Sequence, residues 1–541
     1  MLPQGPVSAR GIALALALGA VPAFLALIWE PELLESTDLP VAGAALALAL
    51  LLGWVLRRGV SALPQRVLLA AALAAAAAPT LISAARLHAP ITNDERSYLY
   101  QAELFAAGRL SEPLPPLKDA WHRRQIFEDE ERGLRYSKYP PGTAAALAPG
   151  VALGWPHLST LLAGLLDVLL VTAVAHRLGL RSPGLAGLLL ALSPFFLLVQ
   201  TSFQSEVYSL PAALAGYWAL LRAREGPLTG RRAAAFGALA GACCGFVFLG
   251  RPLTGLLLAA ALGLGFLRGP RRGLALSGAI AGGAPFVALA LLYNVAQTGN
   301  YFTIPYHLYA VKYGPWYAEG GLPKDVYGNG DFWHGVLALS GRWSVAFAGM
   351  LGAAALGVWG LFRLRQHDGG AGLIFMAAGL VAYAFHWYPG HYGYLGPLYG
   401  FEALGFLTLG AIALLANAAP RWRAGFLGAA LLAGPTAFAF RWDVLERESD
   451  LRSAPERAAA GAPPGSVILL IPFGNSRQDD PSLKYWSPSR PTQDPRQVLL
   501  LRAPDTRQAR RLLEETGLAG RPVFVFRPEG RDGRLEAVPV Y

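Results

Sequence analysis

The stretch ITNDERSYLYQAELFAAGRL, residues 91–110, interrupts a sequence that is otherwise rich in alanine, leucine and glycine. Two adjacent carboxylates, Asp94 and Glu95, stand directly after an apolar run. Such a pair either caps a helix or takes part in chemistry. The choice depends on where the stretch lies relative to its apolar surroundings.

The apolar surroundings indicate a membrane protein. Of the 541 residues, 54% are hydrophobic and 15% are charged, whereas about 25% charged residues is usual in soluble proteins. Each apolar run is long enough to cross a hydrocarbon core of roughly 30 Å as a helix. We therefore expect a mainly α, polytopic membrane protein of about thirteen transmembrane helices. The expected spans are residues 11–29, 40–57, 66–86, 157–175, 183–199, 208–222, 233–250, 253–268, 274–293, 335–362, 371–387, 398–417 and 424–440.

The basic residues set the expected orientation. The net charge of +11 is not a nucleic-acid signal, because the lysines and arginines cluster in short loops between spans, as in cytoplasmic loops. The basic loops are residues 57–66, 176–181, 222–232, 268–273, 363–367 and 421–423. The N-terminus is then cytoplasmic and the C-terminus extracytoplasmic. Residues 86–141 form the first large outer loop, which holds Asp94 and Glu95.

The chain divides into two expected domains. Residues 1–440 form the transmembrane domain, and residues 441–541 are polar and rich in proline and arginine. Within the second part, the β-like runs SVILLIPF, QVLLLRA and PVFVFRP surround a helical pattern, DTRQARRLLEETG, which predicts a small extracytoplasmic α/β domain. The two cysteines, Cys243 and Cys244, are adjacent within a span, so neither a disulfide framework nor a cysteine metal site is expected.

The segment TNDE, residues 92–95, has the form of a capping box. Thr92 caps the helix start, and Glu95 reaches back to the Thr92 backbone N–H. Gly108 ends the helix, whose Tyr98 lies on a face suited to the membrane surface. This explanation accounts for Glu95 better than for Asp94, since a capping box does not need an acid at that position.

The stretch RQIFEDEERGLRYSKYPPGTAAALAPG, residues 124–150, predicts a hairpin that turns near Arg132 and Gly133 and re-enters the membrane at Pro140. Lys138 stands just outside this entry, at headgroup height. It is either an interfacial lysine whose stem lies along apolar surface or a ligand for an anionic group.

Two further charges stand at outer helix ends. Glu206 is an isolated carboxylate beside the membrane, which is a functional candidate by default; the alternative is an acid at a helix start. Arg251 is a basic residue on the outer side, against the prevailing charge pattern. It binds an anionic group or pairs with Asp94 or Glu206.

Two outer loops, residues 293–321 and 386–402, are crowded with tyrosine, tryptophan and histidine. An interfacial aromatic belt explains many of these residues but not His307, His386 and His391. A metal site is the less favoured interpretation, because no HExxH-like spacing appears.

Taken in order, these motifs resemble those of the GT-C glycosyltransferases. The similarity is closest to the bacterial branch near the protein O-mannosyltransferases and the lipid A aminoarabinose transferases, which is glycosyltransferase family 39/83-like. It rests on NDERSYLYQAELFAAGRL (93–110), SKYPPGTAAALAPG (137–150), Glu206, TGNYFTIPY (298–306) and GPLY (396–399). The family's last motif has an arginine where this chain has leucine.

The resemblance implies a GT-C fold and transfer of a sugar from a polyprenyl-phosphate-linked donor to an extracytoplasmic acceptor hydroxyl. Asp94 is then the general base and Glu95 its orienting or capping neighbour. Lys138 and Arg251 bind the donor phosphate, with Arg251 compensating for the leucine at 398. The expected substrate-binding residues are Glu206, Tyr98, His391, Tyr392 and Tyr399.

The implied partners are the lipid donor, a glycan, lipid or protein acceptor, and membrane lipids, with no nucleic acid. A monophosphate donor requires no cofactor or metal, whereas a diphosphate donor favours a divalent cation bridging carboxylates. The implied location is the bacterial cytoplasmic membrane. The alternatives are a transporter or flippase, a diphosphate-donor oligosaccharide transferase or ligase, and an envelope scaffold. Transporter acids usually lie near the bilayer midplane, whereas these acids gather on one outer face.

Overall fold

The structure is a computed structural model. It describes residues 63–115, 125–225, 229–313, 336, 339–340, 342–343, 347, 353–365, 370–384, 392, 396–471, 496–503, 506–529 and 532–537. The expected spans at 11–29 and 40–57 lie outside the described residues, as does His391. The full count of thirteen spans therefore stays a prediction.

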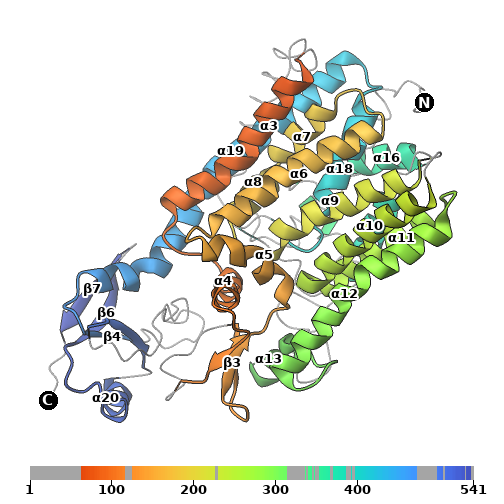
Figure 1. The fold of residues 1–541 in the computed structure, drawn as a ribbon. Coiled ribbons are helices and arrows are strands. Elements are labelled where there is room, and N and C mark those ends of the chain that lie inside the picture. The colour runs from red at the N-terminus through yellow and green to blue at the C-terminus, as the bar shows by residue number, and fades with distance from the viewer. Residues whose placement is uncertain are drawn as a thin grey trace.

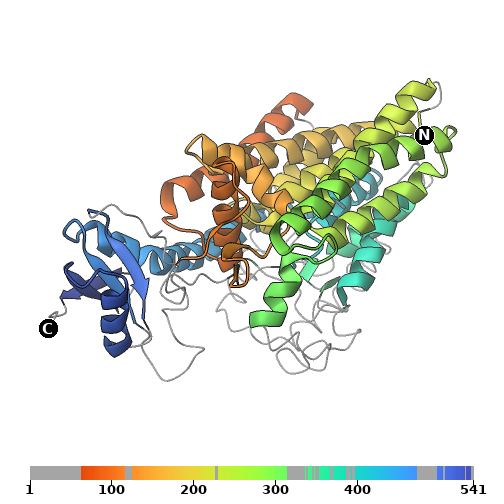
Figure 2. The ribbon, with the colours of Figure 1, turned by 60° about the horizontal axis from the view of Figure 1, so that its bottom comes forward.

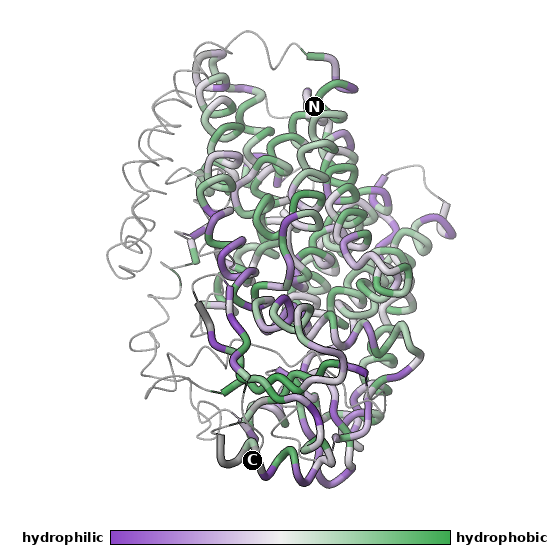
Figure 3. The backbone as a smooth tube through the Cα atoms, turned by 90° about the vertical axis from the view of Figure 1, so that its left-hand side faces the viewer, coloured by the Kyte–Doolittle hydropathy of each residue, from purple (hydrophilic) through white to green (hydrophobic). Residues whose placement is uncertain are grey.

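A bundle of apolar helices forms most of the molecule (Figure 1). Five described helices are long and apolar enough to cross a membrane. Hydrophobic residues predominate along the bundle, and polar residues gather toward the end that carries the C-terminus (Figure 3). The five are α3 (Gln65–Arg86), α6 (His157–Arg177), α10 (Gly230–Gly250), α12 (Arg272–Thr298) and α19 (Pro420–Ala460). Other bundle helices are α9 (Ser205–Ala223), α11 (Pro252–Phe266), α16 (Ala353–Leu364), α17 (Gly370–Ala384) and α18 (Ala403–Leu415). The chain is a membrane protein.

The span expected at 183–199 is two helices, α7 (Pro183–Ala191) and α8 (Pro194–Val199). Pro194 causes the break, because proline has no N–H to donate and its ring clashes with the preceding turn. The two helices are nevertheless buried at every position except Pro183.

Small residues let helices approach closely. A Cβ added at Gly360 of α16 would lie 1.7 Å from the Gly410 carbonyl oxygen of α18, and one at Gly241 of α10 would lie 1.9 Å from the Ala279 carbonyl oxygen of α12. Close backbone packing of this kind is how helices associate where lipid removes the hydrophobic drive between them.

The segment between α3 and α6 forms a layer over one end of the bundle. It holds α4 (Asn93–Ala106), the strands β1 (Glu112–Pro113), β2 (Ile126–Asp129) and β3 (Leu134–Ser137), and α5 (Pro141–Ala152). Strands β2 and β3 pair antiparallel, and Gly133, with φ at 63°, supplies the turn conformation that favours glycine. The predicted hairpin is confirmed. Helix α13 (Pro305–Tyr313) follows α12 and packs beside this hairpin.

Helix α19 is 41 residues long and continues through the boundary expected at residue 440. The segment after 440 is charged, so its hydropathy falls, but it is rich in alanine, glutamate and arginine, which favour helix. The helix leads from the bundle to a four-stranded sheet beside it (Figures 1 and 2).

The sheet has the order β5-β4-β6-β7. Its strands are β4 (Val467–Leu470), β5 (Leu499–Arg502), β6 (Val523–Glu529) and β7 (Asp532–Ala537). Strand β4 pairs in parallel with β5 and β6, and β7 pairs antiparallel with β6. One face packs on α20 (Thr506–Glu515) and the other on the end of α19. Its position as an extracytoplasmic domain stays a prediction.

Candidate active site at the start of the outer layer

The start of α4 is held by the predicted capping box. The Thr92 side chain accepts from the Glu95 backbone N–H at 3.1 Å, and Glu95 Oε2 accepts from the Thr92 backbone N–H at 3.0 Å and from Thr92 Oγ1 at 2.9 Å. The capping interpretation of Glu95 is confirmed.

The second oxygen of Glu95 is also occupied. Its Oε1 accepts from the Phe203 backbone N–H at 3.2 Å and from the Tyr392 hydroxyl at 3.4 Å. Burial raises the pKa of Glu95, while the donors on Phe203 and Thr92 and the charge of Arg452 act in the opposite direction. Glu95 is 1% exposed, so it joins α4 to the α8–α9 connection and does not face a substrate.

Asp94 differs from its neighbour because it is partly exposed. The Asp94 carboxylate lies close enough to the Tyr139 hydroxyl to raise the pKa of that hydroxyl, and its charge also acts on Tyr98 and Tyr399. The rings of Tyr98 and Tyr139 lie 4.4 Å apart. Burial and the Asp94 charge raise the pKa of both tyrosines well above the usual value, which keeps their hydroxyls protonated as donors. Asp94 therefore lies beside three tyrosines, Tyr98, Tyr139 and Tyr399, which together we call the tyrosine wall.

The Lys138 ammonium lies over the ring of Tyr139. Its Nζ is 4.9 Å from the ring centroid of Tyr139, 4.5 Å from that of Tyr306 and 4.8 Å from that of Tyr309. Helix α13 supplies the last two rings and is fixed to the hairpin, because the Tyr309 hydroxyl accepts from the Gln125 backbone N–H at 3.2 Å. Contacts with three ring faces hold the ammonium in place. The side chain is only 7% exposed.

Arg251 joins α10 to α11 and pairs with two buried carboxylates. It bonds Glu206 and lies 3.3 Å from Glu402 Oε1 through its Nε. Its guanidinium also donates to Ser205 Oγ at 3.0 Å and lies 5.6 Å from the Tyr399 ring centroid. Of the two interpretations of Arg251, pairing with Glu206 is the one observed.

The residues around Arg251 adjoin the tyrosine wall, because the Arg251 guanidinium lies 5.6 Å from the Tyr399 ring centroid and the charges of Glu206 and Arg251 act on Tyr98. Arg251 Nη2 also donates to the Leu398 carbonyl at 3.4 Å, beside the position where the resembling family has an arginine. Glu206 is 3% exposed and is engaged by Arg251.

Glu402 is the member of this cluster that the sequence interpretation missed. It is fully buried and accepts from Ser209 Oγ at 2.5 Å. The signal was present, because an acid preceding an apolar run satisfies the same criterion that selected Glu206. Tyr392 was expected in a substrate pocket, but it is 1% exposed and its hydroxyl bonds Glu95. Within the described part of the chain, no group of three metal-ligating side chains occurs.

No protein-family model matches the chain, and no curated protein matches it by sequence. Among solved structures, ArnT from Cupriavidus metallidurans bound to undecaprenyl phosphate matches with a TM-score of 0.51 and 14% identity, over 85% of this chain and 92% of that one. AglB, an oligosaccharyltransferase from Archaeoglobus fulgidus in complex with an inhibitory peptide and a dolichol-phosphate, has a TM-score of 0.41 and 14% identity over 72% of this chain and 58% of that one. The arabinofuranosyltransferase AftD from Mycobacteria has a TM-score of 0.39 and 16% identity over 87% and 36%. These neighbours are GT-C membrane glycosyltransferases, and the likeness to ArnT shows that this chain has the GT-C fold.

Proposed function

We propose that this protein transfers a sugar from a polyprenyl-phosphate-linked donor to the hydroxyl of an extracytoplasmic acceptor. The observation that carries the proposal is the position of Tyr139, whose hydroxyl lies beside the Asp94 carboxylate and whose ring centroid is 4.9 Å from Lys138 Nζ. A carboxylate and a cation are thereby brought to one aromatic side chain. The fold shared with ArnT, a protein solved with undecaprenyl phosphate, supports a lipid-phosphate donor and favours a transferase over a transporter.

The transfer step needs a base and a cation. The acceptor oxygen forms a bond to the anomeric carbon, the bond from that carbon to the phosphate oxygen breaks, and the leaving phosphate keeps the electron pair. Asp94 takes the proton from the acceptor hydroxyl, a role for which a positioned carboxylate is suited. Lys138 offsets the charge that develops on the phosphate.

The geometry supports different roles for the other predicted residues. Glu95 is engaged as a cap, so Asp94 alone carries the base role. We assign the phosphate contact to Lys138 because its ammonium lies 4.9 Å from the ring centroid of Tyr139, beside Asp94. Arg251 is paired with two carboxylates. Arg251 instead fixes Glu206 and supports the ring of Tyr399. Tyr98 and Tyr399 line the wall beside Asp94 and face the bound sugar.

The proposal also includes an orientation. The wall lies at the end of the bundle formed by the segments expected outside, so the reaction takes place on the outer face of a bacterial cytoplasmic membrane. The N-terminus is cytoplasmic, and the sheet of residues 466–537 is extracytoplasmic. This agrees with the basic loops at the opposite helix ends.

The test compares Asp94→Asn with Glu103→Gln, which removes an exposed carboxylate from the same helix. Each variant complements a deletion strain, and envelope glycolipids and glycoproteins are compared by mass spectrometry. We expect Asp94→Asn to lower product by about 10²–10⁴-fold, the usual contribution of a general base, and Glu103→Gln to match wild type.

The same variants are tested for binding of undecaprenyl phosphate in nanodiscs by native mass spectrometry, and we expect both to bind as wild type does. Near-normal product from Asp94→Asn would refute the base assignment. Identical envelope profiles in wild type and the deletion strain would refute the transferase function. Loss of product on chelation of divalent cations would indicate the diphosphate-donor alternative.

A further inference from the structure

Helix α19 touches the connection between α3 and α4 after it leaves the bundle. The Ser449 hydroxyl accepts from the backbone N–H groups of His88 and Ala89, both at 2.9 Å, and donates to the Ala89 carbonyl at 2.9 Å. A serine hydroxyl has one donor and two acceptor sites, so every one is used. Ser449 is fully buried, and it therefore fixes the backbone four residues before the start of α4.

Arg452, one turn further along α19, reaches the first residue of α4. Its Nη1 donates to Asn93 Oδ1 at 3.2 Å, and its own carbonyl accepts from Arg96 Nη2 at 3.1 Å. Asn93 directly precedes Asp94. The helix start is thus held from within by the Thr92 capping box and from outside by α19.

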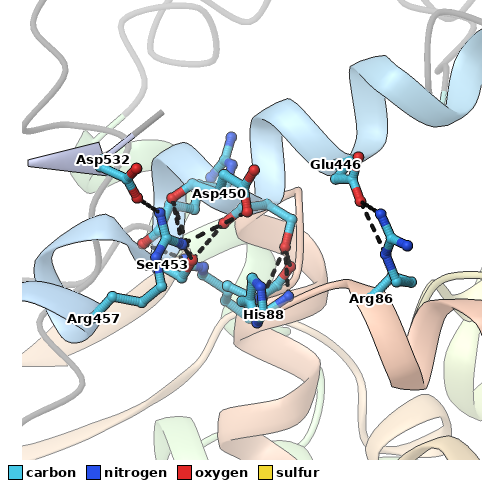
Figure 4. Close-up of polar contacts among 11 residues, drawn as sticks. Arg86, His88, Glu446, Asp450, Ser453, Arg457 and Asp532 are labelled. Atoms are coloured by element: carbon cyan, nitrogen blue, oxygen red, sulfur yellow. Dashed lines mark hydrogen bonds and ion pairs between the residues drawn. The ribbon is translucent and has the colours of Figure 1, made fainter. Parts of the chain in front are cut away.

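The same helix carries the sheet. Ala454 of α19 is buried with Ile468 and Phe526, and Arg457 lies 2.8 Å from Asp532 of β7. Figure 4 shows the extent of this contact zone, with the Arg86–Glu446 pair near one end, the Arg457–Asp532 pair near the other, and His88 between them. The same segment of α19 therefore contacts both the sheet and the connection that leads to Asp94.

We infer that Ser449 and Arg452 are positioning residues that set the place of the Asp94 carboxylate. The inference rests on the proposed function, in which Asp94 is the base. Proton transfer needs the base within about 3 Å of the acceptor hydroxyl, and catalytic groups must be held to roughly 0.5 Å. The capping box fixes the conformation of the first turn of α4. Ser449 and Arg452 fix the position of that turn relative to α19.

The experiment uses the full chain with four variants, Arg452→Ala, Arg452→Lys, Ser449→Ala and Arg447→Ala. Arg452→Ala removes the bond to Asn93, and Ser449→Ala removes the acceptor of two backbone N–H groups. Arg447→Ala is the matched control, because Arg447 lies on the same helix, is 58% exposed and pairs with the exposed Asp443. The readouts are hydrogen–deuterium exchange of the peptide covering residues 88–96, undecaprenyl phosphate binding and envelope product in the complemented strain.

We expect exchange in residues 88–96 to rise about tenfold in Arg452→Ala and Ser449→Ala, as for loss of a buried or charge-assisted hydrogen bond. Product should fall by at least about tenfold. The affinity for undecaprenyl phosphate should stay within about twofold of wild type, because the contacts of Lys138 with Tyr139, Tyr306 and Tyr309 are unchanged. Arg452→Lys, which keeps one donor, should recover part of the product. Arg447→Ala should match wild type throughout.

Each outcome decides a separate question. Unchanged exchange in both variants would overturn the mechanical link. Raised exchange with unchanged product would overturn the positioning role. A product loss matched by an equal loss of undecaprenyl phosphate binding would mean general unfolding and would also overturn it. If Asp94→Asn itself leaves product unchanged, the proposed function fails, while the exchange result still decides whether α19 holds α4.

Discussion

Replacing Glu95 should lower the stability of the protein, whereas replacing the adjacent Asp94 should not. Glu95 accepts four hydrogen bonds, from the Thr92 backbone, the Thr92 hydroxyl, the Phe203 backbone and the Tyr392 hydroxyl. Alanine removes both acceptor oxygens, and with them all four hydrogen bonds, from a fully enclosed site. We expect Glu95→Ala to destabilise the protein and Asp94→Asn to leave its stability unchanged.

The size of the effect follows from these contacts. Loss of the reciprocal cap costs about 1 kcal/mol. The buried Phe203 N–H, left without an acceptor, costs about 1–3 kcal/mol more. Burial raises the pKa of Glu95, so removing the carboxyl recovers part of its desolvation cost. The net loss in free energy of unfolding is then about 2–3 kcal/mol.

The assay is denaturant-induced unfolding of purified protein in mild detergent, followed by tryptophan fluorescence. Glu95→Gln is the graded control, since it keeps the volume and one acceptor oxygen, and we expect about half the loss from it. Glu95→Ala with wild-type stability but no transfer activity would refute the structural role. A loss of more than about 1 kcal/mol in Asp94→Asn would show that Asp94, too, supports the fold.

Three further predictions concern the surrounding cluster and the bundle. Arg251→Met leaves two buried glutamates without their cation and should cost about 3–5 kcal/mol, seen as a lower melting temperature in detergent; an unchanged melting temperature would contradict the paired geometry. Lys138→Ala should weaken undecaprenyl phosphate binding by about tenfold or more, measured by native mass spectrometry, and wild-type affinity would exclude Lys138 from the phosphate site. Gly360→Ala should cost about 1–3 kcal/mol, because its Cβ would overlap the Gly410 carbonyl. The control Gly379→Ala meets no atom within 4 Å, so equal stability of these two alanine variants would argue against the close helix contact.

Local patterns predicted the elements near the site well. The TNDE capping box, the turn at Gly133 and the span that became α3 depend on residues close in sequence, and the structure has each of them. Hydropathy did not predict the break at Pro194 or the length of α19. In both cases hydropathy averaged over a window of residues does not show the local cause. The cause is a proline in the first case and a run of good helix formers in the second.

The pairings across the site were less predictable. The approach of Tyr139 to Asp94, the Glu402 contact with Arg251 and the Ser449 contact with His88 join separate segments of the chain. Sequence spacing identifies which charges stand at helix ends that are expected on the outer side, but helix packing decides which of them meet. Pairing with Glu206 was one of the alternatives that the sequence left open for Arg251, and the arrangement of α9 and α10 decided between them.

The position of α19 late in the chain has a consequence for when the site is completed during synthesis. The bond from His88 to Ser449 joins residues 361 apart, which a ribosome covers in roughly 20–70 s at 5–20 residues per second. Helix α4 and its cap form from neighbouring residues long before then. The start of α4 can be anchored only after α19 has been made and inserted. A nascent chain therefore contains Asp94 early but acquires its fixed position only near the end of translation.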